Sequence, residues 1–254
     1  MTRELNRENG GARNVASWVF GQLLMTSLAL VWAYGLLYAV FAVTTGGKIY
    51  YLAGAYVYLL AAGAVAVDGW LAAGAWRRRT LLAALAVTTA AIIPTALPVL
   101  PPADLGWSSS VNQVSAESLG WPQLVATVAR VWHGLPAATR AQAVIFTSNY
   151  GEAGAINELG RGAGLPRAVS GHNTEWWWGP GNPRATTVVA VGPGPVDATD
   201  YGAYLRTFCG RVRAVATLRN PYGIKNQEED GHVYLCTGLR RSLGRLWLTL
   251  RSYS

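Results

Sequence analysis

Apolar residues in the first part of the chain fall into long blocks with almost no charge between them. No charged residue occurs between Arg13 and Lys48, and further uncharged runs extend over 49–67 and from Thr80 to about Leu100. Each run exceeds the roughly 18 residues that mark a transmembrane helix. A buried helix of a soluble protein is the alternative, but successive runs of this kind favour membrane spans. The pattern predicts spans over about 15–43, 49–67 and 80–100.

Prolines and apolar length define the ends of this membrane part. The first run is too long for the apolar region of a cleavable secretion signal, so we expect it to stay as an anchor. The third run contains Pro94, which predicts a kink, and Pro98, Pro101 and Pro102 follow, so this helix should end near Leu97. The sequence therefore predicts a transmembrane region over 1–102 and a second domain over 103–254.

Basic residues set the expected orientation. The cluster Arg77–Arg79 lies between the second and third predicted spans, and Arg3, Arg7 and Arg13 precede the first. Because Lys and Arg next to membrane spans concentrate on the cytoplasmic side, the N-terminus should lie inside. The residues from about 103 onward should then lie outside, which predicts a multi-pass protein of the cell membrane.

Short apolar runs alternate with helical spacing after residue 103. This pattern predicts an extracytoplasmic α/β domain with a partly parallel sheet, whose ligands would bind at the carboxyl ends of the strands. Those ends carry Asn149–Tyr150, His172–Asn173 and Gly192–Pro193. The predicted strands are 143–147, 167–170, 187–191, 212–218 and 232–236, and the predicted helices are 121–135, 151–159 and 197–208, the last capped by Asp197.

Composition agrees with a membrane protein and argues against nucleic-acid binding. Of 254 residues, 51% are hydrophobic and only 13% are charged, and the formal net charge is +8. About half of this positive charge belongs to the segments that flank the spans. The other Arg residues are scattered among acids, and no basic stripe interleaved with aromatic residues is present. We expect no nucleic-acid partner.

Several residues after the predicted strands could carry chemistry, and each has a structural alternative. Glu152 falls in the first turn of a helix, where it would either stabilise the helix dipole or accept a hydrogen bond from a sugar hydroxyl. His172 has no second His nearby at ligand spacing, which argues against zinc, and the Gly-x-Ser-x-Gly hydrolase motif is absent. The sequence therefore predicts no metal site and no cofactor.

Aromatic and basic residues near the membrane could either contact the membrane interface or bind a ligand. The adjacent indoles of Trp176–Trp178 cannot all face one core, and an exposed Trp suits either the membrane interface or the apolar face of a sugar. Lys48 could meet a lipid-linked phosphate as a point charge, or extend to the headgroups. Tyr50 and Tyr51 fit an aromatic belt better than a binding site.

These segments carry a family resemblance. The stretches Phe146–Ile156 and Ser170–Pro180 resemble the C-terminal extracytoplasmic region of bacterial multispanning glycosyltransferases of the dolichyl-phosphate-mannose protein mannosyltransferase type, relatives of the aminoarabinose transferases with the GT-C architecture. The resemblance extends to four shorter stretches: Gln22–Met25, Lys48–Leu52, Leu60–Val65 and Leu97–Pro101. It implies transfer of a sugar from a polyprenyl-phosphate carrier to an acceptor at the outer face of the membrane.

The chain also departs from that family. The family's catalytic acid lies in the first extracytoplasmic loop near its N-terminus, and this chain resembles only the later part of the pattern. Tyr56–Val57 stands where the family usually has Tyr-Pro. We therefore expect a glycosyltransferase-like protein that is incomplete alone, and we assign no catalytic residue within it. The alternatives are a split subunit whose partner chain supplies the missing N-terminal half, a degenerate copy, and a truncated reading frame.

The remaining expectations concern binding and the cysteines. Partners would be membrane lipid and a polyprenyl-phosphate-linked sugar. A membrane-anchored carbohydrate-binding or accessory module without catalysis is an alternative, as is a structural membrane protein. Cys209 and Cys236 could pair in an oxidising compartment or remain buried thiols. The predicted substrate-binding residues are Lys48, Asn149, Tyr150, Glu152, His172, Asn173 and Trp178.

Overall fold

The chain divides into two compact units, Met1–Leu85 and Ala86–Ser254. The computed structural model describes residues 18, 22, 25, 26, 28–41, 43, 52–97, 99–109, 113–194 and 200–253. Lys48, Tyr50, Tyr51, Asp197 and the three Arg residues before the first predicted span lie outside these residues.

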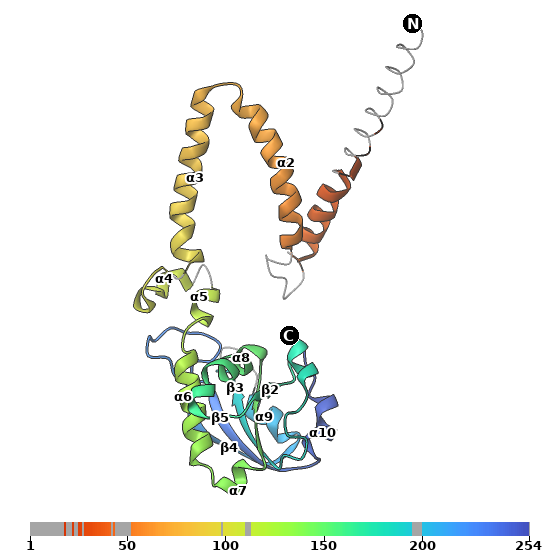
Figure 1. Ribbon diagram of the computed structural model, residues 1–254, viewed down its shortest axis with the longest axis vertical. Coiled ribbons are helices and arrows are strands. Elements are labelled where there is room, and N and C mark those ends of the chain that lie inside the picture. Colours follow the sequence, from red (N-terminus) through yellow and green to blue (C-terminus); the bar gives the residue numbers. More distant parts are fainter. Residues whose placement is uncertain are drawn as a thin grey trace, which may run out of the picture. The chain divides into compact units, whose positions relative to one another are not determined.

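Long apolar helices with no buried residue dominate the first unit, and the second of them continues across the unit boundary (Figure 1). Helix α2 (Ala53–Leu71) has 19 residues and α3 (Ala75–Ala96) has 22, and both are long and apolar enough to cross a membrane. Large side chains such as Val57 (76% exposed) and Leu60 (73% exposed) point away from any core. Such surfaces are unfavourable in water, so length, composition and exposure together suit membrane anchoring.

The two helices are displaced from the predicted spans. The turn between them is only Ala72–Gly74, so the Arg77–Arg79 cluster lies in the first two turns of α3 rather than in a linker, and Asp68 lies within α2. The Arg77 side chain reaches back to donate a hydrogen bond from Nη1 to the Trp70 carbonyl (3.0 Å). A flexible basic side chain can thus remain in a helix while its charge extends to the helix end.

The other membrane predictions are only partly covered by the described residues. The end of α3 at Ala96, with Pro94 inside the helix, agrees with the predicted end near Leu97. Within the predicted span 15–43, the described residues contain an apolar helix over Leu28–Phe41, which is shorter than a membrane span.

The second unit contains an α/β domain built on a five-stranded mixed sheet of order β2-β1-β3-β5-β4. The strands β2, β1 and β3 are parallel, whereas β5 is antiparallel to both β3 and β4. The carboxyl ends of β1, β2 and β3 therefore share one edge of the sheet, as the sequence predicted. The strands are β1 (Ala143–Thr147), β2 (Ala168–Ser170), β3 (Thr187–Gly192), β4 (Cys209–Thr217) and β5 (His232–Leu239).

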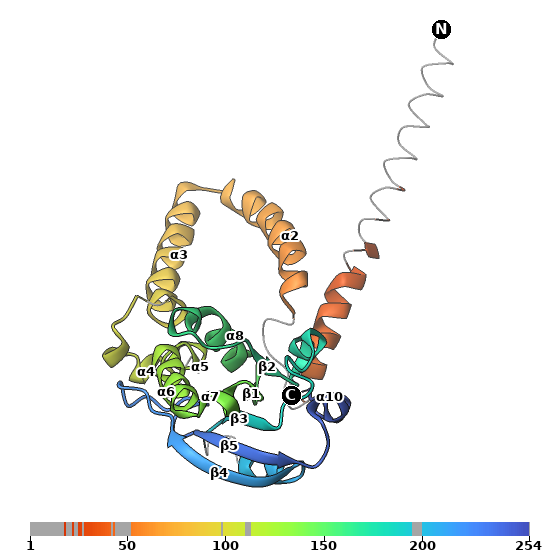
Figure 2. The same cartoon turned by 60° about the horizontal axis from the view of Figure 1, so that its bottom comes forward.

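Helices cover both faces of this sheet, which explains why its central strands are buried throughout (Figure 2). Alternate residues of each strand enter different cores: Ile145 and Val189 pack with α6 (Trp121–Gly134) and α8 (Tyr150–Leu159). Phe146 and Val188 pack with α9 (Tyr201–Arg206), α10 (Leu243–Leu246) and η6 (Trp247–Thr249). Continuous apolar strands are what a sheet covered on both faces requires.

Most predicted elements of this domain are confirmed, and the helix after β3 is corrected. The predicted helix 197–208 is shorter in the structure, where α9 begins at Tyr201 and Asp200 caps it by accepting a hydrogen bond from Ala203 N (2.8 Å). Either Asp could cap a helix, and the sequence pattern did not distinguish them. The remaining short elements are η2 (Pro102–Asp104), α4 (Gly106–Ser109), α5 (Gln113–Glu117), α7 (Ala137–Arg140), η3 (Arg161–Ala163) and η4 (Asn173–Trp178).

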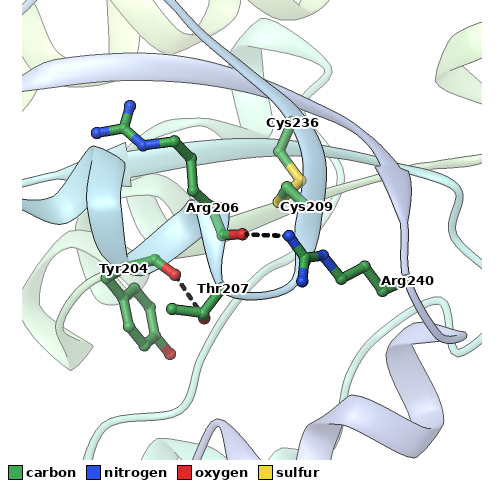
Figure 3. Close-up of a disulfide and its surroundings, with 6 residues drawn as sticks. All are labelled: Tyr204, Arg206, Thr207, Cys209, Cys236 and Arg240. Atoms are coloured by element: carbon green, nitrogen blue, oxygen red, sulfur yellow. Dashed lines mark hydrogen bonds between the residues drawn. A yellow bond between two sulfur atoms is a disulfide. The ribbon is translucent and has the colours of Figure 1, made fainter.

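Cys209 and Cys236 form a disulfide that joins β4 to β5 (Figure 3). Their Cα atoms are 5.8 Å apart, and both residues are buried in the core on the α9 face. Next to the bridge, Nη2 of Arg240 donates a hydrogen bond to the Arg206 carbonyl (3.3 Å). Of the two alternatives for these cysteines, the structure shows the pair.

Candidate functional site

A cleft of about 330 Å³ opens at the edge of the sheet where the parallel strands end. We call it the strand-end cleft. Ser148 and Asn149 follow β1, Gly171 and His172 follow β2, and Pro193 follows β3, and all of them line it. The remaining lining residues come from β1, from α9, from the loop before β5 and from the C-terminal segment, namely Phe146, Tyr201, Tyr204, Gln227, Thr249, Leu250, Arg251, Ser252 and Tyr253.

The two predicted binding segments meet beside this cleft. The rings of Tyr150 and His172 lie 5.0 Å apart with planes tilted by 30°. His172 is nearly buried, whereas Tyr150 is 51% exposed, so the pair presents one accessible aromatic face. The predicted proximity of these segments is confirmed, and their role in binding stays a prediction.

A capping box fixes the turn from β1 into α8. Oδ1 of Asn149 accepts a hydrogen bond from Glu152 N (2.9 Å), and Oε2 of Glu152 accepts one from Asn149 N (3.3 Å). The same Oε2 also accepts from Ser148 N (2.8 Å) and Ser148 Oγ (2.8 Å). This reciprocal arrangement satisfies donors that a helix start leaves without intrahelical partners. The Glu152 side chain is fully buried. Of its two predicted roles, the structure shows it stabilising the helix start that shapes the cleft.

A glycine allows the C-terminal segment to form a wall of the cleft. A side chain at Gly171 would collide with the Leu250 carbonyl, so only glycine permits this close approach. The approach aligns His172 with Ser252 in a β-bridge, in which Ser252 N donates to the Gly171 carbonyl (2.9 Å) and Asn173 N to the Ser252 carbonyl (2.9 Å). Arg251 and Tyr253 thereby reach the cleft.

Arg251 supplies a cation in an aromatic setting. Its guanidinium lies 4.6 Å from the ring centre of Trp176, 5.0 Å from that of Trp177 and 5.0 Å from that of Tyr253. Among the described residues that line the cleft, it is the one Lys, Arg, Asp or Glu. Such stacking orients the planar guanidinium and leaves its N–H groups available at the edge.

Tyr201 supplies a neutral hydroxyl at the base of the cleft. Burial chiefly, followed by the charge of Glu152 and by Tyr204 and Tyr234, raises the pKa of Tyr201 well above its usual value of 10.0. The hydroxyl is buried and has no hydrogen-bond partner among the described residues. Because buried hydroxyls normally have a partner, this group suits a polar atom that enters from the cleft.

Of the three Trp residues of η4, one is hydrogen-bonded to η6 and the other two are exposed. Nε1 of Trp176 donates to the Trp247 carbonyl (2.8 Å) and Nε1 of Trp247 donates to the Trp176 carbonyl (3.0 Å), which fastens η4 to η6. Trp177 and Trp178 are 68% and 66% exposed. As predicted, the three indoles do not share one core.

Trp178 does not lie in the strand-end cleft, so the single predicted pocket is corrected. It lines a second cleft, which we call the helix-side cleft, formed by α8, η3, the loop before β2 and η4. The turn of η4 carries Trp178 away from His172, while Asn173 contributes a backbone hydrogen bond near the strand-end cleft without lining it. Lys48, the remaining predicted binding residue, is outside the described part of the chain.

Sequence reasoning missed Tyr201, Tyr204, Gln227, Arg251 and Tyr253. No local motif marks them, because they reach the cleft through tertiary contacts made far along the chain. The closest signal is the cationic and aromatic ending Arg251-Ser-Tyr253. No protein-family model, curated protein or solved structure gave a match to this chain.

Proposed function

We propose that this chain is a membrane-anchored, glycosyltransferase-like protein whose α/β domain binds the sugar-bearing end of a polyprenyl-phosphate-linked substrate. The observation that carries the proposal is the strand-end cleft. It combines the aromatic ring of Tyr253, the neutral hydroxyl of Tyr201 and the cation of Arg251, and the ring of Tyr150 lies beside it against His172. Aromatic rings suit the apolar faces of sugars, and a guanidinium suits a phosphate.

The proposed location is the bacterial cell membrane, with the α/β domain outside the cytoplasm. Helices α2 and α3 are long and apolar enough to be membrane spans, and the α/β domain carries a disulfide. Disulfides persist in oxidising compartments, and the basic cluster at the start of α3 favours the cytoplasmic side for that helix end. Both observations support an outward-facing domain.

Within this proposal the chain contributes binding, and a partner chain contributes the catalytic acid. The buried Glu152 carboxylate is engaged in the capping box, and no Asp or Glu occurs among the described residues that line the strand-end cleft. Activation of an acceptor hydroxyl requires a base within hydrogen-bond reach. The same observation favours the second candidate, a carbohydrate-binding accessory module without catalysis.

Binding by the full chain in lipid nanodiscs tests the proposal, with undecaprenyl-phosphate-mannose as the probe. Because charge-assisted hydrogen bonds contribute about 1.5–3 kcal/mol, Arg251→Gln should weaken binding roughly tenfold or more. Arg245→Gln is the matched control, since Arg245 is exposed on α10 and does not line the cleft. Equal affinities for the unchanged protein and Arg251→Gln would overturn the proposed site.

Two further measurements separate the two candidates. If free methyl α-mannoside displaces the lipid-linked probe as well as unlabelled lipid-linked mannose does, the phosphate is not recognised and the accessory module is favoured. Mannose transfer to an acceptor by the purified chain alone would contradict the proposed division between this chain and a partner.

A further inference from the structure

The helix-side cleft has a volume of about 490 Å³, within the range of small-molecule sites. Its apolar lining comes from the buried Ile156 and from Leu165 and Pro166. Gly154 leaves open space above α8, because a side chain there would meet no other atom within 4 Å. Trp178, Arg167 and Glu175 also line it.

Trp178 is held as an exposed platform in this cleft. The guanidinium of Arg167 lies 4.9 Å from the centre of its ring, and Nη2 of Arg167 lies 3.6 Å from Oε1 of Glu175. These contacts orient the indole while the residue remains 66% exposed. An oriented indole that carries a guanidinium over its ring and remains largely exposed offers an aromatic surface next to hydrogen-bonding groups. This combination matches the two chemistries of a pyranose, which has an apolar C–H face and polar hydroxyls around it.

The charges of this cleft favour a neutral ligand. Its charged lining residues are two carboxylates and two guanidiniums, which form ion pairs between Arg161 and Glu158 (2.7 Å) and between Arg167 and Glu175 (3.6 Å). A surface that binds an anionic bilayer needs excess positive charge. Here the charges balance, so an exposed Trp in this setting fits a hydroxyl-rich neutral molecule better than a membrane.

We infer that the helix-side cleft is a second carbohydrate-binding site, which takes a neutral pyranose stacked on Trp178. Arg167 donates hydrogen bonds to its hydroxyls and Glu175 accepts them. This inference goes beyond the proposed function, because it depends on none of the residues that line the strand-end cleft. It assigns the chain two carbohydrate sites with no lining residue in common, one of them for a sugar that carries no charge.

Saturation-transfer difference NMR on the full chain in detergent micelles tests the inference. The probes are methyl α-mannoside, methyl α-glucoside, methyl β-galactoside and the corresponding methyl disaccharides. At least one should show transfer to its ring C–H protons. Trp178→Ala should bind the sugar probe roughly tenfold more weakly, because the sugar loses its aromatic stacking partner. Trp178→Phe should retain part of the affinity, because a smaller ring still offers a face.

Two variants provide controls for position. Trp177→Ala removes a neighbouring indole of the same exposure that does not line the helix-side cleft, and it should leave binding of the neutral sugar unchanged. Arg251→Gln should also leave it unchanged, although that variant weakens binding at the strand-end cleft. Sugar affinity that drops with Arg251→Gln but not with Trp178→Ala would place the ligand in the other cleft and overturn the inference.

The membrane alternative has its own outcome. If none of the probes binds at millimolar concentration, while bromine-labelled lipids quench a Trp fluorescence component that is missing in Trp178→Ala, the indole contacts the bilayer. That result would overturn the second carbohydrate site. It would leave the strand-end cleft untouched, since Trp178 does not line that cleft.

Discussion

At the scale of single residues, the acids behind the strand-end cleft are unusual in their burial. Glu228 is 7% exposed and Glu152 is fully buried. Burial chiefly, together with the charges of Glu152 and Glu117, raises the pKa of Glu228 from 4.5 to about 8, against the lowering effect of its backbone N–H and the Asn149 amide. Like charges in a low-dielectric site resist ionising together, so Glu228 retains its proton at neutral pH.

Stability should therefore fall as the pH rises. Between about 4.5 and 8 the folded chain keeps a proton on Glu228 that the unfolded chain has lost, so stability declines by up to about 1.4 kcal/mol per pH unit and levels off above about 8. Thermal unfolding of the full chain in one detergent from pH 5 to 9 measures this decline. Glu228→Gln should flatten the profile and raise the Tm at pH 8, whereas Glu158→Gln, at an exposed position, should not. A profile unchanged by Glu228→Gln would contradict the assignment.

Local patterns predicted one part of the strand-end cleft and could not predict the other. Asn149, Tyr150 and His172 follow short apolar strands, and parallel strands end at a common edge, so their proximity follows from the sequence. Arg251 and Tyr253 reach the cleft only because Gly171 admits the Leu250 carbonyl. That contact joins segments distant in the sequence and leaves no periodic signal. Trp178 was misplaced because the turn of a 3-10 helix cannot be inferred from three identical residues.

At the scale of elements, whether a segment forms a helix or a strand was more predictable than which strands pair in the sheet. The buried strands β1 and β3 are short continuous apolar runs, whereas the longer helix α6 has apolar residues at helical spacing. The sequence pattern therefore distinguishes the two types of element. The antiparallel insertion of β5 between β3 and β4 depends on packing in the two cores on either face of the sheet, which no single segment encodes. The disulfide follows from this pairing, since it connects two neighbouring strands.

Reduction of that disulfide should destabilise the domain. The cysteines are 27 residues apart, so closing this loop contributes about 3–4 kcal/mol in the chain-entropy description. In thermal unfolding of the full chain, tris(2-carboxyethyl)phosphine should lower the Tm by roughly 10 °C. The variant with both Cys209→Ala and Cys236→Ala is the control, because the reductant should leave its Tm unchanged. Equal Tm values for the oxidised and reduced protein would show that the bridge adds no stability.

At the scale of the whole molecule, the orientation of the chain depends on the short turn between α2 and α3. Arg77 donates to the Trp70 carbonyl and lies over the Trp70 and Trp76 rings, at 5.3 and 5.7 Å from their centres. Aromatic and basic residues together are typical of a membrane interface, and the basic ones favour its cytoplasmic side. If α3 starts on that side and spans the membrane, its last residue, Ala96, lies on the other. This argument holds whatever the number of spans before α2.

Labelling of single introduced cysteines tests this orientation in intact cells. The native cysteines are unsuitable reporters because they are bonded to each other and no more than 1% exposed. Glu158→Cys, at an exposed position of α8, should react with a membrane-impermeant maleimide before permeabilisation. Ala73→Cys, exposed in the turn between α2 and α3, should react only afterwards, because the basic residues at the start of α3 favour the cytoplasmic side. The reverse pattern would place the α/β domain inside the cell, where a disulfide is hard to maintain, and would remove the basis for binding a substrate at the outer face.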